Sequence, residues 1–168
     1  FLARGDHYLL VLNNDSAVFA LARPDAGEEP RADILRMKFV GANHSPSVTG
    51  EKVLEGKTNY FHGNDPSQWK TEIANYERVR YSNVYNGIDV VYYGNGSQLE
   101  YDLVVAAQAN PGSIEIDFGN RQMHIDGDGN LVLNIGDQEV LQSRPKIYQD
   151  LEGEKHSVEG RYLIKDNN

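Results

Sequence analysis

Short apolar segments that recur along the whole chain constrain its fold more than any other feature of the sequence. Segments rich in Val, Ile, Leu, Tyr and Phe return roughly every 8 to 14 residues and are separated by Gly, Asn, Asp and Pro. This pattern predicts an all-β fold, an antiparallel β-sandwich with roughly a dozen strands and little helix. The chain has 168 residues, enough to bury one sizeable core, so we expect a single domain over residues 1–168.

The candidate strands share this apolar character and lie between turn-forming residues. The polar segment 24–30 contains two prolines and is expected to be an exposed loop. The candidate strands are 7–12, 17–22, 35–40, 57–61, 76–81, 88–93, 99–105, 113–118, 122–125, 131–135, 139–142, 146–149 and 158–164.

One helical turn is expected between these strands. Asp65 can cap it, Pro66 fits the first helical position, and Gln68 stands where a capping box places Glu or Gln. Trp69, which follows this turn, is expected to point towards the sheets.

A hairpin over residues 88–103 is the most detailed local prediction. Asn95-Gly96 suits a tight turn, because both residues accept positive φ. Pairing Gly94 with Ser97 fixes the register and puts alternate residues on one face, which we expect to be core. The expected pairs on that face are Tyr92 with Leu99, Val90 with Tyr101, and Ile88 with Leu103.

The opposite face of this hairpin gathers the carboxylates of Asp89, Glu100 and Asp102. Paired carboxylates with separated pKa values are what glycoside hydrolysis needs, so these three are the candidate catalytic residues of an alternative, enzymatic interpretation. We favour a structural role, in which Arg78 and Arg80 lie on one face of the preceding strand and form a ladder of ion pairs with the acids. On that interpretation the chain has no catalytic residue.

Aromatic residues supply the candidate ligand-binding site. Their flat faces and polar tips suit the amphipathic rings of a polysaccharide, although tyrosines in β domains commonly serve packing. The candidate residues are Trp69, Tyr60, Tyr76, Tyr85 and Tyr93.

The turn after residue 125 spaces three oxygen-bearing side chains at alternate positions, those of Asp126, Asp128 and Asn130. Hard-cation loops have this spacing, but the distal bidentate Glu of an EF-hand is missing. The same residues are typical of a plain hairpin turn. We therefore expect no cofactor, with calcium at this turn as the alternative.

Composition and charge exclude several function classes. The net charge is −9 and no Lys/Arg cluster exceeds two residues, which argues against nucleic acid as a partner. No run approaches the roughly 18 apolar residues of a membrane span. The chain has no cysteine, its five histidines lack the spacing of a zinc protease, and it has neither a nucleophile elbow nor a phosphate loop.

Several longer motifs carry a resemblance that spans nearly the whole chain. They are LRMKFVGAN (35–43), NYFHGNDPSQW (59–69), RVRY (78–81), YNGIDVVYYG (85–94), LEYDLVV (99–105) and RPKIYQ (144–149). With these motifs the chain resembles a bacterial domain of unknown function that precedes SBBP-type β-propeller repeats in long secreted proteins. The resemblance implies a β-rich fold, an extracellular or cell-surface location and a fragment of a larger modular surface protein. It implies no established activity and no catalytic residues.

Three functions follow as hypotheses. The first is a non-catalytic extracellular module for adhesion or polysaccharide binding. The second is a glycan-active hydrolase that uses the carboxylates. The third is a structural assembly domain, which pairs its sheet edges with adjacent repeats of the same polypeptide.

Overall fold

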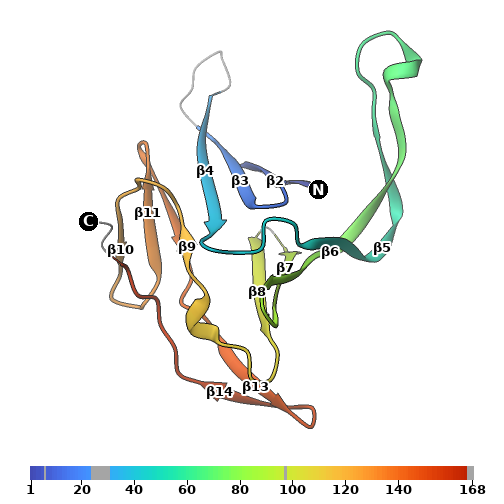
Figure 1. The fold of residues 1–168 in the computed structure, drawn as a ribbon. Coiled ribbons are helices and arrows are strands. Elements are labelled where there is room, and N and C mark those ends of the chain that lie inside the picture. Colours follow the sequence, from blue (N-terminus) through green and yellow to red (C-terminus); the bar gives the residue numbers. More distant parts are fainter. Residues whose placement is uncertain (6, 24–30, 97, 166–168) are drawn as a thin grey trace.

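The computed structural model describes residues 1–5, 7–23, 31–96 and 98–165, and it is all-β (Figure 1). Within these ranges fourteen strands form four antiparallel sheets, which confirms the predicted fold class. The helical segments in the described residues are two single 3-10 turns, η1 (Pro66–Gln68) and η2 (Pro111–Ser113), so no helix there is long enough to cross a membrane. The predicted loop 24–30 lies outside the described residues.

The four sheets are named A to D in the order in which they begin along the chain. Sheet A has the strand order β1 (Leu2–Arg4), β2 (Tyr8–Leu12), β3 (Ser16–Ala22), β4 (Ala32–Phe39) and β9 (Ile116–Asp117). Sheet B consists of β5 (Ser47–Tyr60), β6 (Lys70–Tyr85), β7 (Ile88–Asn95) and β8 (Gln98–Val105). Sheet C contains β10 (Met123–Ile125), β11 (Leu131–Ile135) and β12 (Gln138–Gln142), and sheet D pairs β13 (Ile147–Leu151) with β14 (Glu154–Val158).

Sheets A, B and C pack around one hydrophobic core. Alternating residues of each strand point inwards, as the period of two in a β-strand requires. Sheet A contributes Leu10 and Met37, sheet B contributes Val90 and Tyr92, and sheet C contributes Leu133, all of them buried. Each such large apolar side chain stabilises the fold by about 1.5–3 kcal/mol relative to exposure.

The hairpin of β7 and β8 forms, but its register differs from the predicted one. Gly94 lies opposite Leu99 and Asn95 opposite Gln98, so the expected pairing of Gly94 with Ser97 is wrong by two residues. The reason is the turn itself: Asn95 is the last paired residue of β7, and Gly96, with φ +62°, follows it. A displacement of two keeps every side chain on its predicted face.

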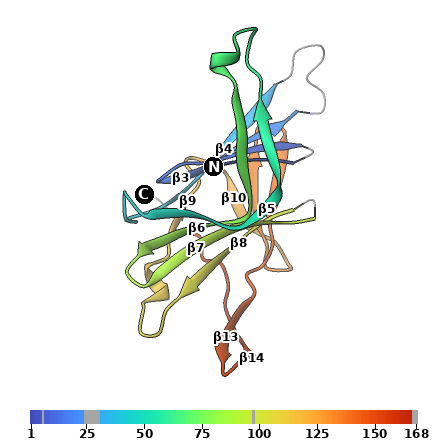
Figure 2. The same ribbon diagram turned by 90° about the vertical axis from the view of Figure 1, so that its right-hand side faces the viewer.

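Strands β5 and β6 are much longer than the predicted segments 57–61 and 76–81. They span 14 and 16 residues and pair with each other, with register shifts between Val53 and Lys57 and between Thr58 and Tyr60. The pairing of β7 with β6 reaches only to Arg78, so residues 53–76 continue as a two-stranded ribbon. This ribbon, here called the arm, projects from the body of the molecule (Figures 1 and 2).

The predicted helical turn is confirmed as η1, at the tip of the arm. Asp65 caps it, and its carboxylate accepts a hydrogen bond from the Ser67 N–H at 2.9 Å. Trp69 does not point towards the sheets as expected, because the turn lies far out on the arm. Its ring stands edge-on to Phe61, with centroids 5.0 Å apart, and its Nε1–H donates to the Gly63 carbonyl.

Two predicted strands near the C-terminal end are also corrected. Segment 113–118 contains the end of η2 and only the two-residue strand β9. Segment 158–164 is not a strand, because the last strand, β14, ends at Val158. In both places local apolar character predicts a strand, but a neighbouring strand to complete its hydrogen bonds is available for only part of the segment.

Candidate functional site

The three predicted carboxylates share the outer face of sheet B. In the observed register Asp89 lies opposite Val104, Glu100 opposite Tyr93, and Asp102 opposite Val91. The structure therefore brings the acids onto one face, as alternation requires.

Arg80 neutralises part of this acidic face. Its guanidinium lies 3.1 Å from the Asp89 carboxylate and 2.5 Å from the Glu51 carboxylate on β5. The hydrogen bond to Glu51 raises the pKa of Arg80 most, and the hydrogen bond to Asp89 raises it further. The second oxygen of Asp89 accepts the Asn83 N–H at 2.8 Å. Asp89 is thus held from two sides, in agreement with the predicted ion pair.

The other predicted arginine does not reach the acids. Arg78 pairs with its neighbour Glu77 at 3.3 Å, and its guanidinium lies 5.2 Å from the centre of the Tyr93 ring. Tyr93 donates its hydroxyl to Asp102 at 3.0 Å, and burial together with this carboxylate raises the pKa of Tyr93. Glu100 accepts a hydrogen bond from the Asn95 amide. Of the three carboxylates in the expected ladder, one is therefore paired with an arginine and two accept hydrogen bonds from neutral donors.

The five predicted ligand-binding aromatics do not form one platform. Tyr85 is used internally, since its hydroxyl donates to the Val40 carbonyl at 2.9 Å. Tyr76 stands edge-on to Phe1. Tyr93 lies beside Arg78, so only Tyr60 and Trp69 share one place, on the arm. Sequence alternation says which face of a strand a tyrosine takes, but not which strands become neighbours.

The Asp-rich turn between β10 and β11 uses its polar side chains internally. One oxygen of Asp126 accepts the backbone N–H groups of Asp128 and Asn130, and the other accepts the Asn130 amide. These hydrogen bonds lower the pKa of Asp126, and the bond from the Asn130 side chain has the largest effect. Among the described residues, no three His, Asp or Glu side chains are grouped as a metal site would require. The turn geometry is that of an Asx-turn hairpin.

The arm carries the feature that the sequence analysis missed. Large apolar side chains are exposed along both of its strands, and Phe61 is 65% exposed. A long polar segment that contains isolated pairs of apolar residues on either side of Gly63-Asn64 was the available signal. The exposed apolar residues of the arm are Val53, Leu54, Tyr60, Phe61, Trp69 and Ile73.

Polar side chains form hydrogen bonds between the two strands of the arm. Thr58 donates its hydroxyl to Asn75 at 2.7 Å, and the Asn75 amide donates to the Gly56 carbonyl. Near the tip, Asn59 accepts the backbone N–H of Glu72 at 2.8 Å. These cross-strand bonds matter because a two-stranded ribbon alone is only marginally stable in water.

Sheet D is a second projecting ribbon. Every residue of β13 and β14 is exposed, including the apolar Ile147, Tyr148, Leu151 and Val158. Both views place this ribbon at the opposite end of the molecule from the arm (Figures 1 and 2). The molecule therefore presents at each end a ribbon that carries exposed apolar side chains.

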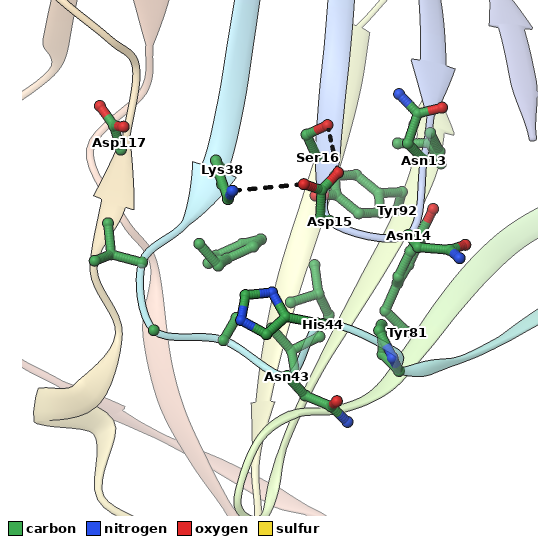
Figure 3. Close-up of a pocket in the computed structure, with 18 residues that line it drawn as sticks. Asn13, Asn14, Asp15, Ser16, Lys38, Asn43, His44, Tyr81, Tyr92 and Asp117 are labelled. Atoms are coloured by element: carbon green, nitrogen blue, oxygen red, sulfur yellow. Dashed lines mark hydrogen bonds and ion pairs between the residues drawn. The ribbon is translucent and has the colours of Figure 1, made fainter.

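A cavity of about 310 Å³ lies at one end of the core, between sheets A and B (Figure 3). The turn between β2 and β3 and the loop after β4 border it, and buried residues of β6 and β7 form its base. None of the three candidate carboxylates and none of the five candidate aromatics lines it.

Comparison with known proteins places the chain in one family. A family model described as "Domain of unknown function (DUF7948)" matches residues 1–168, so the chain belongs to this family. No curated protein and no solved structure matches it.

Proposed function

We propose that this member of the DUF7948 family is a non-catalytic extracellular module for adhesion, and that the arm is its protein-binding element. The observation that supports this is the group of exposed apolar side chains on a ribbon that projects from the core. Contiguous exposed apolar surface on a water-soluble domain marks an interaction site. Aromatic anchors such as Trp69 and Tyr60 are also the residue types that dominate binding energy at protein interfaces. The extracellular location is taken from the resemblance described above.

Side chains of the arm, rather than its strand edges, are suited to this contact. Lys52 and Glu72 have φ values of 55° and 58°, and the register shifts twice along the ribbon. Such irregularities, together with charged edge residues such as Lys57, disfavour the addition of another strand. We therefore propose docking of apolar side chains in place of the edge pairing expected from the sequence.

The partner that fits the arm best is the sheet D ribbon of a second copy of this chain. Both ribbons expose apolar side chains, and they lie at opposite ends of the molecule. A contact between two different surfaces is heterologous, and it joins copies head to tail. Adhesion by this route would build short chains of modules.

The hydrolase alternative has less support. Asp89 is paired with Arg80, Asp102 accepts the Tyr93 hydroxyl, and Glu100 accepts the Asn95 amide. A general acid needs a carboxyl group kept protonated in an apolar pocket, and these three lie on an open sheet face.

Sedimentation velocity over a range of protein concentrations tests the proposed assembly. We expect the sedimentation coefficient to rise with concentration for the wild-type chain. The arm variant Phe61→Ser/Trp69→Ala and the ribbon variant Tyr148→Ser/Leu151→Ser should each stay monomeric. The control Leu141→Ser removes an equally exposed leucine from sheet C and should associate like the wild type.

Mixing the two variants makes the test specific. Each retains the surface that the other lacks, so an equimolar mixture should form a heterodimer that cannot grow further. A wild-type chain that remains monomeric at every concentration, or association that both double variants retain, would overturn the proposal.

A further inference from the structure

The cavity between sheets A and B has an apolar, aromatic base. Leu12, Phe39 and Val90 line it together with the rings of Tyr81 and Tyr92, and all five residues are at most 8% exposed. The two tyrosine rings stand edge-on to each other with centroids 5.7 Å apart. One side of a bound ring-shaped molecule would therefore meet mostly carbon.

The hydroxyls of Tyr81 and Tyr92 are unusual for groups so deeply placed. Neither makes a hydrogen bond with the described residues, although no fully buried polar side-chain atom there lacks a partner. Both hydroxyls are therefore at least partly accessible, and both tyrosines line the cavity. Burial raises the pKa of Tyr81 to about 12, and burial raises that of Tyr92 as well. The two groups thus remain neutral donors and acceptors at physiological pH.

The rim of the cavity is polar and mostly unengaged. The side chains of Asn13, Asn14 and His44 are exposed, line the cavity and make no hydrogen bond with the described residues. Figure 3 shows the His44 ring in front of the cavity and Asn14 at the side of the cavity. Amide side chains both donate and accept hydrogen bonds, as a ligand with several hydroxyls requires.

Two of the three Lys and Asp side chains that line the cavity form an ion pair with each other. Lys38 lies 3.5 Å from the Asp15 carboxylate, which also accepts the Ser16 hydroxyl (Figure 3). The hydrogen bond from Ser16 lowers the pKa of Asp15 most, and the charge of Lys38 lowers it further, so this carboxylate stays ionised at neutral pH. Asp117 at the far edge accepts the Gly119 N–H. The one lysine that lines the cavity is thus already paired with a carboxylate, so the site disfavours an anionic ligand.

We propose that this cavity binds one neutral sugar residue, at the end or on a branch of a glycan. A sugar ring combines a face of C–H groups with hydroxyls that both donate and accept, which matches the apolar base and the polar rim. The volume is at the lower end for ligand sites, so it suits one ring and excludes a longer segment. This proposal does not depend on the arm, which lies elsewhere on the molecule.

NMR titration with glucose, galactose, mannose and N-acetylglucosamine tests it. We expect at least one sugar to shift the amide signals of Asn14, Lys38 and His44 without shifting those of the arm. Tyr92→Phe keeps the ring and removes the hydroxyl. This substitution should raise the dissociation constant of that sugar about threefold to tenfold. Asn14→Ala lies on an exposed turn and should raise this dissociation constant by a similar factor. It tests the proposal even if Tyr92→Phe fails to fold.

Matched controls separate the possible outcomes. Tyr101→Phe removes a buried hydroxyl directly opposite Tyr92, outside the cavity, and should leave sugar binding unchanged. The arm variant Phe61→Ser/Trp69→Ala should also bind normally, so loss of self-association and loss of sugar binding are distinguishable. The proposal is wrong if no sugar shifts the cavity signals, if the shifts map to the arm instead, or if cyclohexanol binds as tightly as the sugars.

Discussion

Gly87 shows how strictly a single position is specified in this fold. It links β6 to β7 with φ +72°, and a Cβ there would lie 3.0 Å from the Cβ of Ala109. Its carbonyl also accepts the Ala106 N–H at 2.9 Å. The left-handed backbone and the close neighbour both require glycine at this place.

Gly87→Ala is expected to lower the free energy of unfolding by about 1–2 kcal/mol, because the new side chain strains the backbone and meets Ala109. Urea unfolding followed by circular dichroism measures this change. Gly94→Ala is the control, since no atom lies within 4 Å of the added carbon and its φ is not in the left-handed region. Equal destabilisation by both substitutions would contradict the explanation.

At the scale of elements, one carboxylate connects three strands from two sheets. Asp33 on β4 receives two hydrogen bonds from Arg23, which follows β3, at 2.6 and 2.8 Å. Gln138 on β12 donates to the same carboxylate at 3.2 Å, so this contact joins sheet C to sheet A. The hydrogen bonds from Arg23 lower the pKa of Asp33 most, and the hydrogen bond from Gln138 lowers it further.

This pKa shift predicts a loss of stability in acid. The folded-state pKa of Asp33 lies below its unfolded value of about 3.9. The ionised carboxylate therefore stabilises the fold fully above that value, and this stabilisation is lost as the pH falls through the folded-state pKa. Asp33→Asn should therefore reduce stability at pH 7 and flatten its fall below about pH 4. Urea unfolding at several pH values checks this. Asp128→Asn, at a carboxylate with no hydrogen bond or ion pair to the described residues, should leave the pH profile unchanged.

The hairpin of β7 and β8 shows which features of an element can be predicted locally. The alternation of Ile88, Val90 and Tyr92 predicts the buried face correctly, and Asn95-Gly96 predicts the turn region. The register could not be predicted, because two choices of central turn residues leave the same side chains facing the core.

At the scale of the whole molecule, stability should vary strongly from the core to the two projecting ribbons. Most of β11 and the first five residues of β7, apart from Asp89, are buried, whereas most of the arm and all of sheet D face solvent. Regions with few buried apolar contacts open at much lower free energy than a core does.

Native-state hydrogen exchange should therefore show amides 53–60, 70–76 and those of sheet D exchanging long before amides of β7 and β11. The measurement is made at low protein concentration, where the proposed self-association is absent. Raising the concentration should then slow exchange in both ribbons and leave the core unchanged. Arm amides as slow as those of β11 in the dilute sample would show that the arm is more stable by itself than a two-stranded ribbon should be.

The sequence by itself determined the fold class, the faces of the hairpin strands, the capped turn at Asp65 and the pairing of Arg80 with Asp89. These depend on period-two alternation and on turn chemistry, both of which act between neighbouring residues. Only the tertiary structure decided that β5 and β6 continue as a projecting arm, that the five candidate aromatics separate, and that Tyr81 and Tyr92 line a cavity between sheets A and B. Those features depend on which strands become neighbours in space, and residues far apart in the chain determine that.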